Sequence, residues 1–434
     1  MNLDEFNSNP VSFLKETFFQ AVKAADPIEI VPKFLPELPK GKVLVVGAGK
    51  AAASMASAVE NSWNNKTCLE GIVITRYEHG LPLKKIRCVE AGHPVPDNAG
   101  EVAAKEIFDC VVKLTSDDLL LVLISGGGSS LLSLPVDGVK NEDLKKVTKQ
   151  LLSSGAPITD INIVRKHLSQ IQGGKLALAS KAKITALIIS DVVGDNPTDI
   201  ASGPCVADPS TFKDALNVIN RWNVVAPKSV LNYLNRGESG VVEETPKPGD
   251  KRLNNAENIV ISTARESLFA ASELAKKAGI NVISLGDAIT GEAKDVGEVM
   301  AGWVRELILF PNSNFKIPLI ILSGGECTVT VKGDGRGGRC AEFLLSTALK
   351  IEALGVQKRV YGLAADTDGI DGVSPHAGVY FDSKTISEIR SQGVDPRAAL
   401  DNNDALGVFE PLNNVITTGP TLTNVNDFRA ILII

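Results

Sequence analysis

The chain has 434 residues, which is more than one hydrophobic core usually organises, so about two to three domains are expected and we favour two. Its composition, 44% hydrophobic and 22% charged, is that of a globular protein and excludes a largely disordered chain. The formal net charge of -6 argues against a nucleic-acid partner, because binding to phosphate backbones needs concentrated Lys and Arg.

Cysteine usage and the lack of long apolar runs indicate the compartment. The six cysteines lie far apart with no C-x-x-C pair, which argues against a zinc ribbon or a disulfide framework and favours a reducing environment. The opening residues MNLDEFNSNP carry acids where a secretory signal needs basic residues, and no apolar run approaches the ~20 residues that cross a bilayer. We therefore expect a cytoplasmic protein with no membrane partner.

The first half of the chain alternates predicted strands and helices. An amphipathic helix over about residues 11–25 and a proline-rich connector precede KVLVVGAGKAAASMASAVE (42–60), which predicts a strand, a tight glycine turn and an alanine-rich helix. The elements predicted after it are a strand over 71–77, a helix over 99–114, a strand over 119–124, a helix over 144–153 and a strand over 184–190. This alternation is typical of βαβ units and predicts a doubly wound α/β domain.

A candidate linker separates this half from a second one. Residues 236–258 lose apolar periodicity and gather Pro, Gly and charge. The elements predicted beyond it are a strand over 258–263, a helix over 264–278, a strand over 281–286, a helix over 292–309 and a strand over 317–325. We expect an N-terminal Rossmann-like domain over residues 1–245 and a second α/β domain over residues 246–434, with the first helix packed on either.

The motif GAGKAA follows a predicted strand and opens a predicted helix. Gly47 and Gly49 fit the G-x-G-x-x-A fingerprint of dinucleotide sites, but the next strand ends in Arg76 where an acid would hold the ribose, so only NADP would suit. Lys50 opposes the dipole of the helix it begins, which is better explained if it holds a phosphate. The alternative is a tight turn with a solvated lysine.

Two apolar strands run into Ser-Gly-Gly turns. Successive glycines can expose a row of backbone N–H groups to phosphate, and apolar segments on both sides argue against a flexible linker. The candidate nucleotide- or substrate-binding residues at these turns are Ser125, Gly126, Gly127, Gly128, Ser129, Ser323, Gly324, Gly325 and Glu326. Sharp turns under tight packing are the alternative, and the likeness of the two turns is better explained by convergence than by duplication.

Two clusters of carboxylates also follow predicted strands. Asp191 and Asp195 lie in one loop, and Asp366 and Asp368 lie in the run DTDGIDG. The carboxyl ends of strands are where open α/β sheets bind ligands, and oxygen-rich clusters suit Mg²⁺. The alternative for each cluster is turn chemistry, in which Asp side chains accept hydrogen bonds from nearby backbone N–H groups, and one of the two could be only that.

Arg336 and Arg339 lie on a glycine-rich loop before a predicted helix near Cys340. Forked guanidinium groups at a helix N-terminus can hold a phosphoryl group or a carboxylate through two hydrogen bonds. A solvated loop is the alternative. The four histidines show neither metal-ligand spacing nor the company of a catalytic triad.

Taken together, these motifs resemble the MOFRL-type, or class II, glycerate 2-kinase family over roughly residues 42–427. The stretches that carry the resemblance are VVGAGKAA, GHPVPD, ISGGGSSLL, INIVRKHLSQIQGGKLA, SDVVGDNPTDIASGPCVADPSTF, LSGGECTV, GRGGR, AADTDGIDG and TGPTLTNVND. The resemblance implies two Rossmann-like α/β domains with largely parallel or mixed sheets flanked by helices, and an active site in the cleft between them. It also implies transfer of the γ-phosphoryl group of ATP to the 2-hydroxyl of D-glycerate with Mg²⁺.

The resemblance also suggests roles for residues. Lys50 would stabilise the phosphates, Arg336 with Arg339 would hold a phosphate or carboxylate, and Asp191 and Asp366 would bind metal or orient the attacking hydroxyl. We therefore take Lys50, Asp191 and Arg336 as the catalytic candidates and Arg339 as a binding residue. The metal candidates are Asp191, Asp195, Asp366 and Asp368.

Departures from the family pattern and rival functions remain open. Cys340 and Ala341 stand where many relatives have Asn and a polar residue, and Leu422 stands where Gly is common, which could alter the fit of the acceptor. Members of the family are also often labelled hydroxypyruvate reductases, so an NAD(P)H-dependent reductase is the first rival, and a sensor without catalysis is the second. The partner is a small-molecule substrate, and a homodimer is left open.

Overall fold

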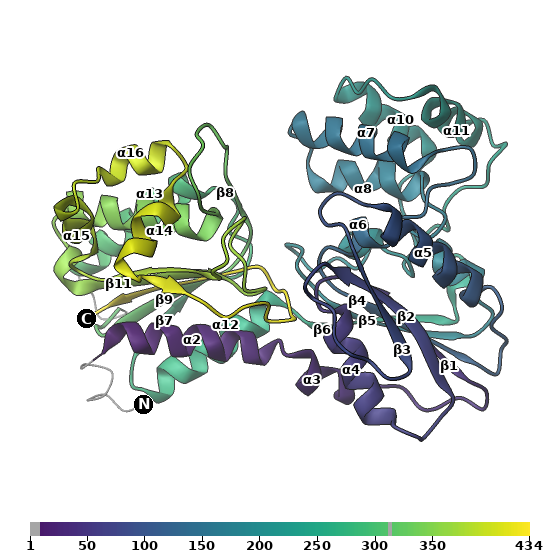
Figure 1. Ribbon diagram of the computed structural model, residues 1–434, viewed down its shortest axis with the longest axis horizontal. Coiled ribbons are helices and arrows are strands. Elements are labelled where there is room, and N and C mark those ends of the chain that lie inside the picture. The colour runs from purple at the N-terminus through teal and green to yellow at the C-terminus, as the bar shows by residue number, and fades with distance from the viewer. Residues whose placement is uncertain (1–8, 311–314) are drawn as a thin grey trace. The chain divides into compact units, whose positions relative to one another are not determined.

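The computed structural model describes residues 9–310 and 315–434, and the chain divides into two units. The middle unit consists of Pro27–Ser262. The terminal unit combines the residues up to Asp26 with Thr263–Ile434, so it is built from both ends of the chain (Figure 1). Residues 1–8, on which part of the expectation about a secretory signal rests, lie outside the described residues.

The middle unit is built on a six-stranded parallel sheet. Its strands are β1 (Val43–Ala48), β2 (Leu69–Arg76), β3 (Ile86–Ala91), β4 (Leu119–Ile124), β5 (Lys183–Ile189) and β6 (Ala256–Ser262). Their order is β3-β2-β1-β4-β5-β6, which is the doubly wound order of Rossmann folds. Every residue of β1 and of β4 is buried, as expected for central strands of a parallel sheet with helices on both faces.

The helices of the middle unit form two groups. The bounds are α3 (Pro27–Ile30), α4 (Ala52–Trp63), α5 (Asn98–Val111), α6 (Gly128–Leu131), α7 (Asn141–Ser153), α8 (Ile158–His167), α9 (Lys175–Ala179), α10 (Phe212–Arg221) and α11 (Lys228–Glu238). Helices α7, α8, α10 and α11 gather in a layer of their own (Figure 1), and their apolar side chains form a separate core around Val147 and Phe212.

The terminal unit contains a six-stranded mixed sheet and a short strand pair. The strands are β7 (Asn281–Ser284), β8 (Gly291–Glu292), β9 (Leu319–Ser323), β10 (Cys327–Thr328), β11 (Val360–Asp366), β12 (Gly378–Phe381), β13 (Val415–Ile416) and β14 (Asp427–Ile433). The large sheet has the order β13-β12-β11-β14-β9-β7, and β14 runs antiparallel to both of its neighbours. The last strand of the chain therefore lies in the interior of the sheet.

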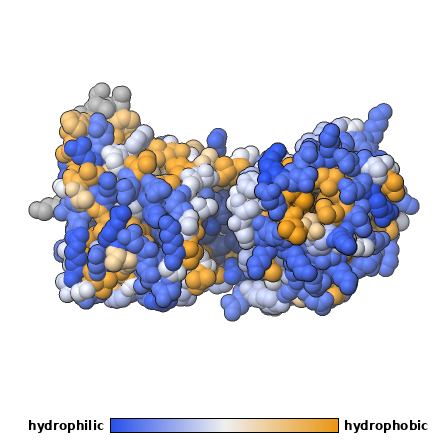
Figure 2. All heavy atoms as spheres, turned by 90° about the horizontal axis from the view of Figure 1, so that it is seen from above, coloured by the Kyte–Doolittle hydropathy of each residue, from blue (hydrophilic) through white to orange (hydrophobic). Residues whose placement is uncertain are grey.

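Helices cover both faces of this sheet. Their bounds are α2 (Pro10–Ala24), α12 (Ala264–Lys277), α13 (Ala293–Leu309), α14 (Arg339–Ala353), α15 (Thr385–Ser391), α16 (Pro396–Asp401) and α17 (Ala405–Phe409). Helices α2 and α12 share one core with one face of the sheet, and α13 and α14 share another core with the opposite face. The face in Figure 2 carries hydrophilic residues around local apolar patches.

The expected fold class is confirmed, and most predicted elements lie within a few residues of their expected positions. The predicted strand over 119–124 is β4, and the predicted helix over 264–278 is α12. Across the described parts of the chain, no helix combines the length and the apolar character needed to span a bilayer.

The units divide later in the chain than the boundary expected after residue 245. The segment expected to open the second domain is β6, which pairs with β5 and completes the first sheet. Thr263 follows β6 directly and caps α12, because the Glu266 carboxylate accepts hydrogen bonds from its N–H and hydroxyl. The polar stretch 236–258 is therefore an internal loop of the middle unit.

Candidate functional site

Three of the predicted site segments follow adjacent parallel strands of the middle unit. Lys50 follows β1, the segment Ser125–Ser129 follows β4, and Asp191 follows β5. Parallel strands end at the same edge, so these groups share the carboxyl edge of the sheet. The strand order reverses between β1 and β4, which is the switch point where open α/β sheets bind ligands.

The N-terminus of α4 is closed by the loop after β4. The N–H of Lys50 donates to the carbonyl of Gly126 at 2.8 Å, and the N–H of Ala51 donates to Oγ of Ser125 at 3.0 Å. A methyl group on Gly49 would come within 2.2 Å of Ser125 Oγ, and a methyl on Gly47 within 2.1 Å of a backbone oxygen of β4. The two loops thus meet at Gly47, Gly49 and Ser125. The backbone N–H groups that would hold a dinucleotide pyrophosphate already donate hydrogen bonds within the protein.

The glycine turn after β4 leaves donors available. The N–H groups of Gly126, Gly127 and Ser129 donate to no residue in the described parts of the chain. Gly127 adopts a φ of 82°, and a methyl on it would lie 2.8 Å from the ring of His93. Gly128 is closely packed, because a methyl group added to it would lie 2.6 Å from Cβ of Ala201. We call these three backbone N–H groups the nest; an anion-binding turn of the kind predicted from the three glycines needs such donors.

A strained loop lies against the nest. Ala201 and Ser202 are buried in the left-handed region, with φ of 50° and 55°. The hydroxyls of Ser129 and Ser202 lie 3.0 Å apart, and Ser202 donates to Oδ1 of Asn162 at 3.0 Å. Strain of this kind persists only where surrounding contacts impose it, and it concentrates at functional sites.

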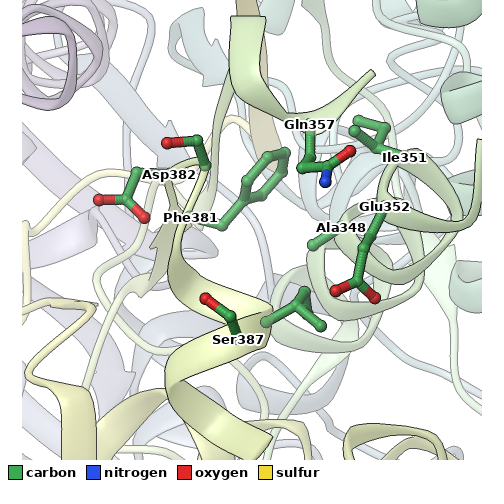
Figure 3. A pocket seen from close by; sticks show the side chains of 9 residues that line it. Ala348, Ile351, Glu352, Gln357, Phe381, Asp382 and Ser387 are labelled. Atoms are coloured by element: carbon green, nitrogen blue, oxygen red, sulfur yellow. The ribbon is translucent and has the colours of Figure 1, made fainter. Parts of the chain in front are cut away.

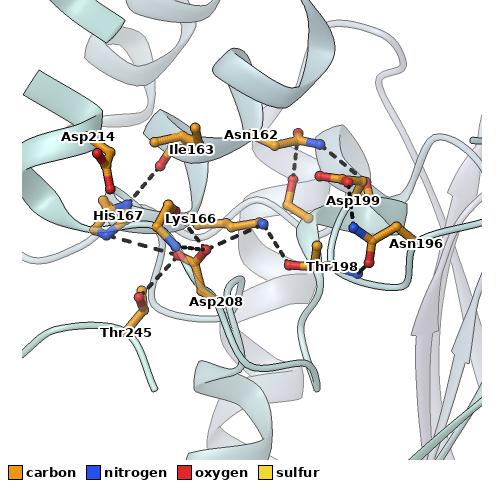
Figure 4. Close-up of polar contacts among 12 residues, drawn as sticks. Asn162, Ile163, Lys166, His167, Asn196, Thr198, Asp199, Asp208, Asp214 and Thr245 are labelled. Atoms are coloured by element: carbon orange, nitrogen blue, oxygen red, sulfur yellow. Dashed lines mark hydrogen bonds and ion pairs between the residues drawn. The ribbon is translucent and has the colours of Figure 1, made fainter. Parts of the chain in front are cut away.

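A buried polar network holds that loop, and sequence reasoning missed it (Figure 4). Lys166 of α8 donates to Thr198 Oγ1 at 2.7 Å and lies 3.5 Å from the carboxylate of Asp208, which is fully buried. Thr245 donates to the same carboxylate at 3.1 Å. Lys166 and Asp208 lie in motifs that carried the family resemblance. Charged residues between apolar neighbours in these motifs could have indicated a buried polar network.

Glu244 extends the network from the stretch expected to be a linker. Its carboxylate lies 3.2 Å from Nε2 of His167 and accepts hydrogen bonds from Nζ of Lys247 at 2.9 Å and from the N–H of Phe212 at 2.7 Å. Burial opposes ionisation of Glu244, but these hydrogen bonds outweigh it and lower its pKa to about 2.

In the terminal unit, Arg339 binds three carboxylates at the start of α14. Its guanidinium lies 2.6 Å from Asp427, 2.7 Å from Asp366 and 3.2 Å from Glu326. Asp427 is also 2.5 Å from the buried guanidinium of Arg429. Burial disfavours the charged form of Asp427, but the two arginines outweigh burial and hold its pKa below the usual value. Arg339 therefore organises acidic groups.

Arg336 has a different environment, although it was predicted to act with Arg339. Its side chain is 59% exposed and forms a surface ion pair with Glu410 at 2.7 Å. A backbone hydrogen bond fixes the glycine-rich loop that carries Arg336, because the N–H of Arg336 donates to the carboxylate of Asp404 at 2.9 Å. Of the two arginines, Arg336 is the one whose guanidinium can be released by breaking a single exposed contact.

The second Ser-Gly-Gly turn is explained by close packing. Gly324 donates to the carbonyl of Gly286 at 2.8 Å, and a methyl on Gly325 would come within 2.2 Å of the carbonyl oxygen of Ile289. Ser323 is buried, and Glu326 is exposed and paired with Arg339. The structure thus gives these glycines a packing role, which was the alternative considered for them.

The aspartates of the DTDGIDG run make turn hydrogen bonds. Asp366 Oδ1 accepts from the N–H of Asp368 at 3.1 Å, and Asp368 accepts from the N–H of Ile370 at 2.9 Å. Asp371 accepts from the N–H groups of Cys340 and Ala341 at the start of α14, while burial, its largest influence, raises its pKa to about 6. Cys340 and Ala341 are buried in the core of the unit.

The metal candidates fall into two pairs, one in each unit. Asp191 and Asp195 are partly exposed after β5, whereas Asp366 and Asp368 are almost fully buried. Within residues 9–310 and 315–434, no group of three or more His, Cys, Asp or Glu side chains is arranged to hold a metal ion. Any Mg²⁺ held here would depend on one or two carboxylates together with ligand oxygens, as is usual when it accompanies a nucleotide.

One pocket of the terminal unit involves none of the predicted residues. It lies between α14 and α15 and is lined by Phe381, Glu352 and Asp382 among others (Figure 3). Glu352 forms an ion pair with Arg390 at 2.6 Å, and Asp382 accepts hydrogen bonds from Thr385. Its acidic groups therefore serve local structure.

Leu422 adopts a φ of 60°, a region that favours glycine. The expectation that glycine is common at this position has a backbone reason, since leucine is strained there.

Comparison with known proteins places these features in a family. Residues 319–427 match the MOFRL family, and residues 13–235 match a domain of unknown function (DUF4147). A glycerate 2-kinase from Pyrococcus horikoshii is 39% identical over 94% of this chain and 93% of its own length. A protein from Agrobacterium vitis named "Putative hydroxypyruvate reductase" is 46% identical over 97% of this chain and 94% of its own length. The crystal structure of a glycerate kinase from Thermotoga maritima matches with a TM-score of 0.86 and 37% identity, covering 98% of this chain and 99% of that one.

Proposed function

The chain belongs to the MOFRL-type glycerate 2-kinase family, and from that premise we propose that it transfers the γ-phosphoryl group of ATP to the 2-hydroxyl of D-glycerate. The products are 2-phosphoglycerate and ADP. The observation that carries the proposal is the nest at the switch point of the middle unit, with Lys50 bonded to it through its backbone.

The nest and Lys50 suit the electrostatic demands of phosphoryl transfer. The transition state is loose and spreads negative charge over the transferring oxygens, so the protein mainly positions the reactants and stabilises that charge. The N–H groups of Gly126, Gly127 and Ser129 are fixed donors, and Lys50 adds a full positive charge. We assign both to the phosphates of the nucleotide.

Asp191 is the proposed acceptor for the proton of the attacking hydroxyl. Oxygen O2 of glycerate forms a bond to the γ-phosphorus, the bond between that phosphorus and the bridging oxygen of ADP breaks, and the hydroxyl proton leaves to the carboxylate. Asp191 follows β5, next to the nest on β4, and is partly exposed. We place its carboxylate within hydrogen-bond reach of the substrate hydroxyl, as a general base requires.

Mg²⁺ fits a limited set of these residues. The ion supplies neutralisation of phosphate charge when it is bound with the nucleotide. Asp195 and Asp191 are partly exposed in the loop after β5 and are the proposed ligands, whereas Asp366 and Asp368 are almost fully buried in the terminal unit. In the terminal unit, we assign a phosphate- or carboxylate-binding role to Arg336 and a positioning role to Arg339.

The test is product identification with a matched pair of variants. Purified chain is incubated with D-glycerate, ATP and Mg²⁺, and the phosphoester is assigned by phosphorus and proton NMR. We expect 2-phosphoglycerate, a loss of about 10²- to 10³-fold in kcat for Lys50→Ala, and no change for Lys149→Ala, which removes an exposed lysine of α7. No phosphoester from the parent chain would refute the proposal, and an unchanged kcat in Lys50→Ala would remove Lys50 from it.

A hydroxypyruvate reductase is the second candidate, because the sheet has Rossmann order and a relative carries that name. Against it, Ser125 and Gly126 already accept hydrogen bonds from the N–H groups at the N-terminus of α4, which a dinucleotide pyrophosphate would need. Hydroxypyruvate and NADPH are assayed in parallel, and oxidation of NADPH without a phosphoester from the kinase assay would favour the reductase.

A further inference from the structure

A narrow pocket of the middle unit gathers two cations and no carboxylate. Arg165 comes from α8 and Lys145 from α7. Hydroxyl groups supply much of the remaining lining, which includes Thr148, Ser129, Ser130 and Ser133. Among the described residues no Asp or Glu lines the pocket, so the formal charges on its wall are both positive.

Arg165 has no counter-ion among the side chains that the structure describes. Its guanidinium makes no hydrogen bond or ion pair with any residue that the structure describes, whereas Arg339 and Arg429 in the terminal unit each bind a carboxylate. Burial lowers the pKa of Arg165 to about 10, so the side chain is still a cation at neutral pH. Arg165 is partly buried, and a partly buried cation without a partner costs free energy that an anion entering the pocket removes.

We propose that this pocket binds an oxyanion, either the carboxylate of the acceptor or a phosphoryl group of the nucleotide, through Arg165 and Lys145. Arginine binds both groups through two parallel hydrogen bonds, and the hydroxyls of Ser133 and Thr148 can donate to the same ligand. The narrowness of the pocket excludes a nucleoside base.

The pocket also borders the nest. Ser129 contributes a free N–H to the nest and lines the pocket, and Ser130 lines it as well. A ligand with a phosphoryl group in the nest can therefore have a neighbouring oxyanion at Arg165. The assignment of this anion to a substrate of phosphoryl transfer rests on the proposed function, whereas anion binding itself does not.

The experiment compares Arg165→Gln with Arg236→Gln in the full chain. Arg236 is an exposed arginine at the end of α11 in the same unit, so its variant controls for the loss of one charge. Dissociation constants for D-glycerate and for inorganic phosphate are measured by calorimetry without nucleotide, and KM is measured for D-glycerate and for ATP. We expect about 10- to 100-fold weaker binding in Arg165→Gln, parental values in Arg236→Gln, and partial recovery in Arg165→Lys.

The outcomes separate the sources of the anion. A rise in KM for glycerate alone assigns the pocket to the acceptor carboxylate, and a rise for ATP alone assigns it to a phosphate. Lys145→Gln serves as the second variant if Arg165→Gln does not fold. Arg165-dependent phosphate binding in a chain that phosphorylates no glycerate would keep the site and refute the kinase. Lack of binding by the parent, or unchanged constants in the folded variants, overturns the proposal.

Discussion

Arg336 precedes α14 and Arg339 begins it, only three positions later, yet their surroundings give them different roles. Arg339 joins Asp427, Asp366 and Glu326, so its removal leaves buried carboxylates short of a counter-ion. Arg336 pairs only with Glu410 at the surface among described side chains. From the sequence, both arginines were predicted to hold a ligand. Their spacing does not show which guanidinium forms ion pairs with carboxylates of its own unit.

The two arginine variants should therefore differ in stability and in activity. Arg339→Gln should lower the free energy of unfolding of the terminal unit by about 3 to 5 kcal/mol, since breaking one side of a buried ion pair strands the other charge. Arg336→Gln should leave stability almost unchanged and lower kcat. Chemical denaturation and steady-state kinetics of both proteins check this, and equal stability losses would contradict the distinction.

At the scale of the element, the glycine turn after β4 can be tested without changing any functional side chain. Gly127 and Gly138 have nearly the same backbone, with φ of 82° and 85°, but a methyl on Gly127 would meet His93 while a methyl on Gly138 would meet nothing within 4 Å. Both Ala variants should lose about 1 to 2 kcal/mol from left-handed strain. Only Gly127→Ala should also lose phosphoryl transfer, and comparable activity in the two proteins would argue against the nest.

The buried network of the middle unit makes a prediction about acid. The pKa of Glu244 falls from an ordinary 4.5 to about 2 on folding, so Glu244 stabilises the fold above pH 4.5 and this contribution disappears as pH falls from 4.5 towards 2. Glu244→Gln should lower the melting temperature at pH 7. The melting temperature of the variant should also fall less than that of the parent as pH drops from 4.5 towards 2. Thermal unfolding from pH 7 to pH 2 measures it, and a variant with the parental acid profile would contradict the assignment.

Elements with strong local patterns were predictable, and long-range polar contacts were not. The apolar run of β4 and the periodicity of α12 identify those elements from their own residues. Glu244 lies in a stretch whose composition is typical of a linker, and its structural role depends on the distant partners His167 and Phe212. The nest was predicted because three glycines act through the backbone, whereas the Arg165 pocket depends on side chains from separate helices.

The pairing of β6 with β5 decides where the chain can be divided. A fragment of residues 27–262 retains all six strands and the network around Asp208, so it should unfold cooperatively as a monomer. A fragment of residues 27–245 lacks β6 and exposes the edge of β5, and it should aggregate or remain unfolded. Size-exclusion chromatography and thermal unfolding distinguish the two, and equal behaviour would favour a boundary at residue 245.

The terminal unit joins α2, the first helix that the structure describes, to β14. Phe18 of α2 and Phe428 of β14 lie with ring centroids 5.9 Å apart, and β14 fills the space between β11 and β9. The ribosome synthesises roughly 5–20 residues per second, so on the order of 20 to 80 seconds separate the synthesis of α2 from that of β14. During that time the apolar face of α2 lacks this strand to pack against. The middle unit has emerged long before, so it can fold first, while the apolar face of α2 is not fully covered until β14 has been synthesised. A premature stop codon that removes only the last few residues should therefore destroy this unit as thoroughly as an early one.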